Sequence, residues 1–97
     1  MGSEYDTGKI RELAQAVARV AEQVAEVNTN TLAPISQEIP ENFAGDAASA
    51  LSQSLDDLWQ DVRTLSSGLS GISEALYALA KRVDAADAAA KALIAQK

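Results

Sequence analysis

The chain has 97 residues, 47% of them hydrophobic and only 4% aromatic, and its net charge is −6. That length allows a single domain, residues 1–97, and the scarcity of aromatic side chains excludes a thick globular core. A negative chain is repelled by phosphate backbones and anionic lipids, so we expect no nucleic-acid binding. No apolar run approaches the roughly 20 residues that span a bilayer, so we expect no membrane insertion either.

Catalysis and metal binding lack their usual residues. The chain has no cysteine and no histidine, which removes the commonest general base, the commonest metal ligand and any disulfide. The remaining candidates are the neighbouring carboxylates Asp56, Asp57 and Asp61, which are typical of a solvated helix face. No compact loop of oxygen ligands accompanies them. We therefore expect neither enzymatic activity nor a cofactor.

The first predicted element is a helix from about residue 7 to 38, with Asp6 or Thr7 as its cap. Its apolar residues recur in alternating steps of three and four, which is typical of one buried helical stripe. The stripe comprises Ile10, Leu13, Val17, Val20, Val24 and Val27. It weakens at the poor helix formers of residues 28–31 and resumes shifted by about one residue.

A turn at about residues 39–45 and a second helix at about residues 46–95 follow. The second stripe keeps its alternation over about six heptads, which indicates a long helix committed to packing on other helices. It comprises Ala48, Leu51, Leu55, Leu58, Val62, Leu65, Leu69, Ile72, Leu76, Leu79, Val83, Ala86, Ala90 and Leu93. Gly68 and Gly71 interrupt it, either as a local kink or as a close crossing with a partner helix, but the phase holds and we expect no loop.

Two long helices joined by so short a connection fold back on each other, so the predicted fold is all-α, an antiparallel two-helix hairpin. In this arrangement Ile10 lies beside roughly Ser73, and helix 2 beyond about residue 78 has no neighbour within the chain. The uncovered stripe is either a binding surface or an alanine-rich tail that needs no partner.

One hairpin covers only one side of each helix, so we expect two hairpins to form a four-helix bundle as a dimer. Trp59 either widens the core of the hairpin or anchors the second hairpin. The expected interface residues are Trp59, Leu65, Gly68, Leu69, Ile72, Leu79 and Leu93.

The turn carries a recognisable motif. Phe43, Ala44 and Gly45 form an aromatic-x-Gly sequence between two helical tracts, in a chain of about 100 residues. This layout resembles the WXG family, the small ESAT-6-like substrates of type VII secretion, with Phe43 in place of the family's tryptophan. From the geometry of a two-helix turn, we expect the Phe43 ring to fold over the ends of both helices and Gly45 to let the backbone pass close. The resemblance implies in addition that the turn meets the export signal of a partner hairpin.

The family's export signal, Tyr-x-x-x-Asp/Glu near the end of helix 2, is altered in this chain. Tyr77 is followed four residues later by Lys81, which is not an acid. A looser form of the signal asks for a hydrophobic residue, an acid four residues later and two further hydrophobic residues on the same face. Val83, Asp87, Ala90 and Ile94 match that spacing.

The resemblance implies a bacterial type VII secretion substrate, or an export-coupled interaction module, which pairs with itself or with a related hairpin protein. The N-terminus has no basic region followed by an apolar stretch, so we expect secretion without a cleaved signal peptide from a cytoplasmic pool. The alternative is a chaperone or targeting partner for the helical N-terminal region of a larger type VII effector, in reach of the secretion ATPase. A third possibility is a coiled-coil scaffold unrelated to secretion.

Overall fold

The computed structural model describes residues 6–96, which are helical almost throughout. The elements are α1 (Thr7–Val27), the π-helical turn η1 (Asn28–Leu32), α2 (Ala33–Asn42) and α3 (Gly45–Ala95). The prediction that the chain is all-α is confirmed for this range. We refer to α1, η1 and α2 together as the first arm and to α3 as the second arm.

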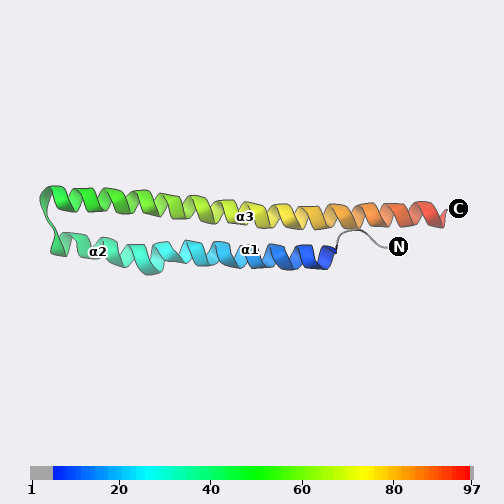
Figure 1. Ribbon diagram of the computed structural model, residues 1–97, viewed down its shortest axis with the longest axis horizontal. Helices are drawn as coiled ribbons and strands as arrows, with labels where there is room; N and C mark the ends of the chain where they lie inside the picture. Colours follow the sequence, from blue (N-terminus) through cyan, green and yellow to red (C-terminus); the bar gives the residue numbers. More distant parts are fainter. Residues whose placement is uncertain (1–5, 97) are drawn as a thin grey trace.

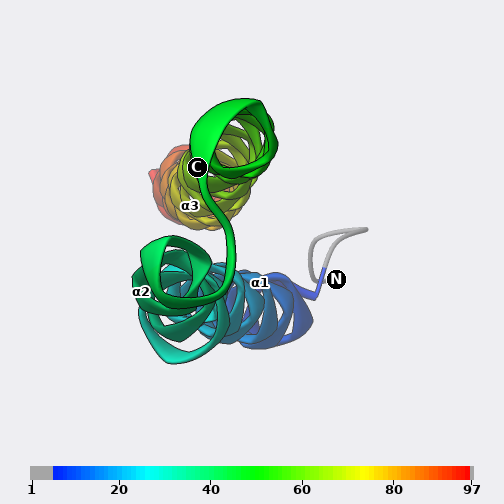
Figure 2. The same ribbon diagram turned by 90° about the vertical axis from the view of Figure 1, so that its left-hand side faces the viewer.

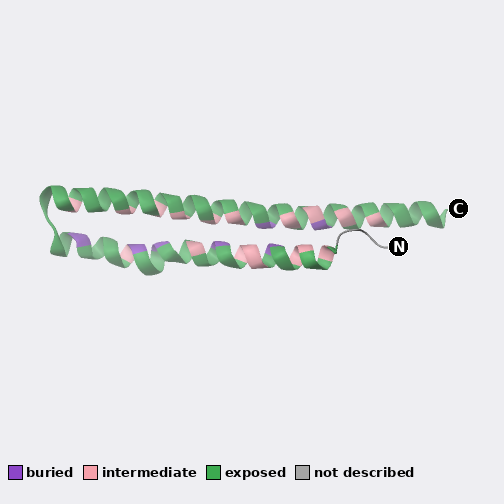
Figure 3. Cartoon of the chain, in the orientation of Figure 1, coloured by how far each residue is buried: buried purple, intermediate pink, exposed green. Residues whose placement is uncertain are grey.

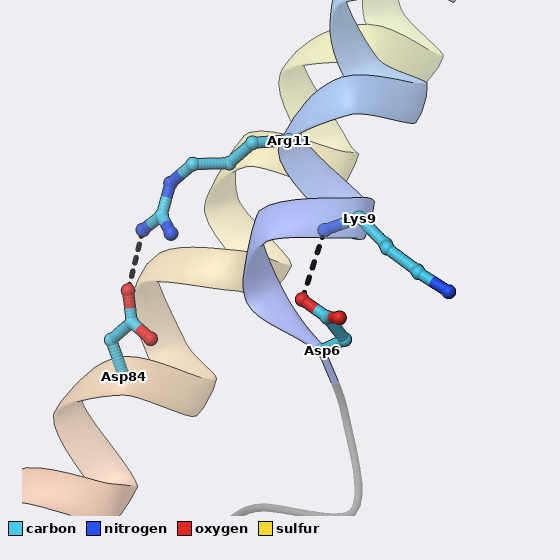
Figure 4. Close-up of polar contacts among 4 residues, drawn as sticks. All are labelled: Asp6, Lys9, Arg11 and Asp84. Carbon is cyan, nitrogen blue, oxygen red and sulfur yellow. Dashed lines mark hydrogen bonds and ion pairs between the residues drawn. The ribbon is translucent and has the colours of Figure 1, made fainter.

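The first arm begins where its capping residue predicts. Of the two expected caps, Asp6 takes the position, and its carboxylate accepts a hydrogen bond from the Lys9 amide at 3.1 Å (Figure 4). This bond satisfies one of the amides that the first turn of a helix leaves without an intrahelical partner.

The π-helical turn η1 explains the shift in the apolar stripe. A π-helical turn accommodates one residue more than an α-helical turn of the same arc. Leu32 and Ile39, on the far side of this turn, are buried although they are out of phase with the stripe of α1. The inserted residue therefore returns the apolar side of α2 to the second arm.

The first arm is longer than predicted. Helix α2 continues to Asn42, so residues 39–42, expected in the turn, are helical and only Phe43 and Ala44 lie between the arms. Pro40 lies inside this helix, three residues before its C-cap, and the carbonyls beside it have partners: the Phe43 amide donates to the Ile39 carbonyl at 2.9 Å and the Asn42 side chain donates to the Glu38 carbonyl at 2.9 Å.

Helix α3 is unbroken over 51 residues, so the expected continuity across Gly68 and Gly71 is confirmed. It lies alongside the first arm and extends beyond it, giving a rod of 79 × 16 × 14 Å (Figure 1). Seen from the turn, the short connection passes from α2 to the start of α3 (Figure 2).

Hydrogen bonds between the arms establish their direction and register. The Ser73 hydroxyl donates to the Ala14 carbonyl at 2.7 Å and the Ser66 hydroxyl donates to the Ala21 carbonyl at 2.9 Å. Later residues of α3 therefore face earlier residues of α1. The predicted pairing of Ser73 with Ile10 is wrong by about one helical turn, because the chain reverses at Phe43–Ala44 rather than nearer the middle of residues 39–45.

Candidate protein-interaction surface

Small and polar side chains, together with Trp59, form the centre of the contact between the arms. We call them the seam, and they recur every seven residues on each arm. The seam consists of Ala14, Ala21 and Asn28 on the first arm and Trp59, Ser66, Ser73 and Ala80 on the second. Except for the half-buried Trp59 and Ser66, they are buried, and they lie on the sides of the arms that face each other (Figure 3).

The seam holds the two backbones close together. In three consecutive layers, a side chain of one arm donates to a backbone carbonyl of the other, the third bond running from Asn28 to Trp59 at 3.2 Å. A serine hydroxyl can reach the opposite backbone only where no large side chain separates the helices. The Asn28 side-chain oxygen is buried without a hydrogen-bond partner, which is the one cost visible in the seam.

The close approach corrects in part the expectation that the arms bury the large apolar stripe of the first helix: Ile10, Val17 and Val24 are half-buried, whereas Leu13, Val20 and Val27 are exposed. Leu13 is 54% exposed, whereas its neighbour Ala14 is fully buried. Val20 and Val27 repeat the pattern one residue before Ala21 and Asn28. The physical reason is that helices packed on alanine and serine come too close for leucine or valine between them, so the larger side chains lie at the edge of the contact.

The stripe of α3 divides in the same way. Alternate members are half-buried against the first arm, namely Ala48, Leu55, Val62, Leu69, Leu76 and Val83, and only the last of this set, Ala90, is exposed. The other members lie one residue before each seam position and form a second row. We call this the α3 row, and it consists of Leu51, Leu58, Leu65, Ile72, Leu79, Ala86 and Leu93. Of its members only Leu79 is half-buried, and the rest are exposed.

The corresponding row on the first arm consists of Leu13, Val20, Val27 and Ile35, all at least 38% exposed. Wherever a seam residue follows, the members of both rows precede it by one position, and Ile35 continues the first-arm row beyond η1. Two helices that run in opposite directions are related by a two-fold axis perpendicular to the plane that contains both. Rotation about this axis keeps each residue on its own side of the plane, so equivalent positions of the two helices lie on the same side. The two rows therefore share one face, which we call the apolar face.

A groove at the turn end supports this placement. It has a volume of about 580 Å³, and its lining includes Ile35 of the first-arm row together with Leu51 and Leu58 of the α3 row. Phe43 and the buried Ile39 also line it. Members of both rows thus border one cavity, which is open on the apolar face.

The opposite face is polar. Arg11 and Asp84 occupy equivalent positions on the two arms, on the side of the seam away from the two rows. They form an ion pair between the arms (Figure 4). The hydrogen bond from Arg11 holds the pKa of the Asp84 carboxyl below its ordinary value, and a hydrogen bond with Thr7 acts in the same direction. Both side chains of the pair are over 40% exposed, so the pair contributes little to stability.

Phe43 and Gly45, the predicted turn motif, lie at the turn end of the apolar face. Phe43 has an extended backbone and a ring that is 49% exposed at the groove. Gly45 adopts a φ of +62°, a left-handed conformation that favours glycine. A Cβ at Gly45 would meet nothing within 4 Å, so the expected close passage of the backbone is wrong and the conformation is the reason for the glycine.

The residues that match the looser export signal do not all lie on the uncovered part of α3. The contact of Arg11 with Asp84 shows that the first arm covers α3 to about residue 84, rather than to residue 78 as expected. Val83 and Asp87 are consequently half-buried, while Ala90 is exposed and Ile94 is 74% exposed. The uncovered tail is shorter than predicted because of the shifted register.

The predicted interface residues fall into two groups. Leu65, Ile72 and Leu93 are exposed members of the α3 row, with Leu79 half-buried in the same row. Trp59 and Leu69 are half-buried toward the first arm. Gly68 lies outside the contact between the arms, and a Cβ there would meet nothing within 4 Å.

The seam itself was missed by sequence reasoning, which followed the large side chains. A signal was present: alanine, serine or asparagine follows a large apolar residue directly at intervals of seven, as in Leu13–Ala14, Val20–Ala21 and Ile72–Ser73. Two heptad repeats one residue apart, one large and one small, indicate a close two-helix contact with a second, exposed face.

Comparisons with protein-family models, with curated proteins and with solved structures found no match. No helix within residues 6–96 has both the length and the hydrophobicity needed to span a bilayer. In that part of the chain, no group of three or more carboxylates lies close enough together to hold a metal ion. The apolar face and its groove are thus the features from which a function can be argued.

Proposed function

We propose that this chain is a small protein-interaction module of the WXG type, which acts as an antiparallel helical hairpin within a four-helix dimer. We further propose that it leaves the cell through a type VII secretion apparatus, or accompanies a protein that does. The expected partners are a second hairpin, a larger effector and the secretion ATPase.

The observation that carries the interaction role is the exposure of large aliphatic side chains along one face. Eight leucine, isoleucine and valine residues of the two rows are between 38% and 55% exposed. A contiguous apolar face of this kind usually marks a surface that another protein covers. The arms have no further apolar layer of their own to place over it, since the seam already occupies the contact between them.

The secretion role depends on the turn. The aromatic-x-Gly sequence joins two long helices in the middle of a short chain, as in the WXG family, and Phe43 is half-exposed beside an apolar groove. A ring in this position can bind the tail of a partner hairpin. In a dimer of oppositely directed rods, that tail would carry Ala90 and Ile94.

The Phe43→Ala variant tests this role. We expect it to weaken dimerisation, export or both, because the ring lines the groove that would receive the partner. Elution volume in size-exclusion chromatography and the amount of protein in the culture medium are the two measurements. Gln60→Ala, which truncates an exposed side chain of α3 outside the apolar face and the export signal, is the control. Unchanged elution and unchanged secretion of the Phe43 variant would count against the proposal.

Dependence on the apparatus needs a separate experiment. A tagged chain is expressed in a bacterium with a type VII system, in the presence and absence of its secretion ATPase. Export that disappears with the ATPase supports the proposal, and export that persists without it leaves only an interaction module.

The departure from the export signal favours a second candidate. Lys81 stands where the family has an acid four residues after the tyrosine, so this chain could depend on the signal of its partner. It would then be a chaperone or targeting partner of a larger effector. Co-purification of a larger chain in equal amounts, in place of self-association, distinguishes this candidate from the first.

A further inference from the structure

We infer that the apolar face binds a second copy of this chain, with the two rods running in opposite directions and Ile72 at the two-fold axis. The inference rests on the proposed function only in taking the apolar face as a docking surface. It adds the identity of the partner and the register of the two copies.

The α3 row is complementary to itself in reverse. Its seven members are evenly spaced, with Ile72 in the middle. When a second row is laid on it in the opposite direction, Leu65 meets Leu79, Leu58 meets Ala86 and Leu51 meets Leu93. A two-fold axis requires such a self-complementary surface, because a contact between residue i of one copy and residue j of the other is repeated with the copies exchanged.

The row beside it on α3 shows the same symmetry and adds charge. We call it the flanking row, and it consists of Ser54, Asp61, Gly68, Ala75, Arg82 and Ala89, each three residues after a member of the α3 row. Reversal about Ile72 places Asp61 within one residue of Arg82 of the second copy, and it does so twice. It also places Gly68 beside Ala75, so small residues meet small residues at the centre.

Gly68 gives this register a physical reason. A glycine inside a helix costs about 1 kcal/mol relative to alanine, and within one chain a Cβ at this position would meet only open space. The packing of the arms therefore gives no reason for a glycine there. A second α3 crossing at Ala75 would require the small residue.

The exposed area is sufficient for such a pair. Eight side chains of the two rows are about half exposed, and at roughly 80 Å² each they offer roughly 650 Å² per copy, close to the ~800 Å² per partner of a standard stable interface. The same register brings the tail of one copy, with Leu93 at 65% exposure, over the groove at the turn of the other. One arrangement thus covers both exposed ends of the apolar face.

Single cysteines test the register, since the chain has none of its own. We expect Ile72→Cys to form a disulfide with itself under mild oxidation, because it lies on the axis. Ser70→Cys, exposed on the polar face of the same turn, is the control and should remain unlinked. A mixture of Leu65→Cys and Leu79→Cys should form mainly mixed pairs, whereas a parallel pair would link each variant to itself.

The charges give a second, independent test in solution. Sedimentation equilibrium should show twice the 10.1 kDa of the single chain. Asp61→Arg should raise the dissociation constant roughly tenfold by placing like charges together, and the double variant Asp61→Arg with Arg82→Asp should restore it. Asp56→Arg, the same charge change on the other side of α3 from the flanking row, should have little effect.

Two outcomes would overturn the inference: a monomer at micromolar concentration, or a dimer in which Ile72→Cys does not link. A monomer that is exported with a different partner removes the self-pairing and leaves the proposed function intact. A dimer in the predicted register that is not exported has the opposite effect, since it supports this inference and removes the secretion role.

Discussion

The two halves of the rod differ in the size of the side chains that meet between the arms. Where α1 lies along α3, alanine and serine meet and serine hydroxyls reach the opposite backbone. Where α2 lies along the start of α3, Leu32 and Ile39 are the buried residues and a groove of about 580 Å³ opens beside Phe43. The comparison indicates that small residues close the arms, whereas large residues leave an opening for a partner.

The most direct way to break the tight half is to enlarge a seam residue. We expect Ala14→Leu to lower the free energy of unfolding by about 3 kcal/mol, because its side chain is fully buried against the second arm and overpacking forces the helices apart. Ala25→Leu, at an exposed position of the same helix, is the control and should change stability little. Urea unfolding followed by circular dichroism gives both values; equal stabilities would mean that the arms are not in close contact at Ala14.

The turn at the open half is tested by its glycine. Gly45 has a φ of +62°, and placing alanine in the left-handed region costs roughly 1–2 kcal/mol. We therefore expect Gly45→Ala to lower the unfolding free energy by about that amount. Gly71→Ala should instead raise it by up to about 1 kcal/mol, since Gly71 is helical and a Cβ there meets nothing. Opposite signs in thermal unfolding are the expected result, and a harmless Gly45 variant would contradict the assigned reason for this glycine.

Much of this architecture is predictable from the sequence. Apolar residues at steps of three and four give the two helices, and Asp6 gives the start of the first. The one-residue shift after Val27 is visible in the sequence, although the π-helical turn that absorbs it is not. Phe43 and Gly45 mark the turn because the chain has a single phenylalanine and a break in both stripes at the same place.

The burial of individual residues could not be predicted in the same way. Leu13 and Ala14 are neighbours, and periodicity alone does not determine which of them faces the other helix. The answer depends on the distance between the helices, which the small residues of both arms set jointly. The register likewise depends on where the chain reverses, and a difference of two residues in the turn moved every facing pair by about one helical turn.

The hydrogen bonds of the seam should have a smaller effect than its shape. Ser73→Ala removes the buried bond of 2.7 Å to the Ala14 carbonyl without adding volume. We expect a loss of about 1 kcal/mol relative to Ser70→Ala, in which the same change is made at an exposed serine of α3. Comparison with the control removes the gain in helix propensity that alanine brings to both variants. Equal stabilities of the two variants would show that the seam depends on shape alone.

The smallest expected effect is that of pH on the stability that the polar face contributes, and its sign follows from the pKa of Asp84. The pKa of this carboxyl is lowered by the hydrogen bond from Arg11, so the folded chain holds the ionised form more strongly than the unfolded chain does. The stabilisation is present above the ordinary pKa of an aspartate and is lost as the pH falls through the lowered value. The difference in melting temperature between the parent chain and Asp84→Asn should therefore be small at pH 7 and should disappear as the pH falls through the lowered pKa of Asp84. High salt should reduce it at pH 7, because the pair is exposed. A difference that persists in acid would show that Asp84 acts through packing and that its ion pair with Arg11 does not stabilise the fold.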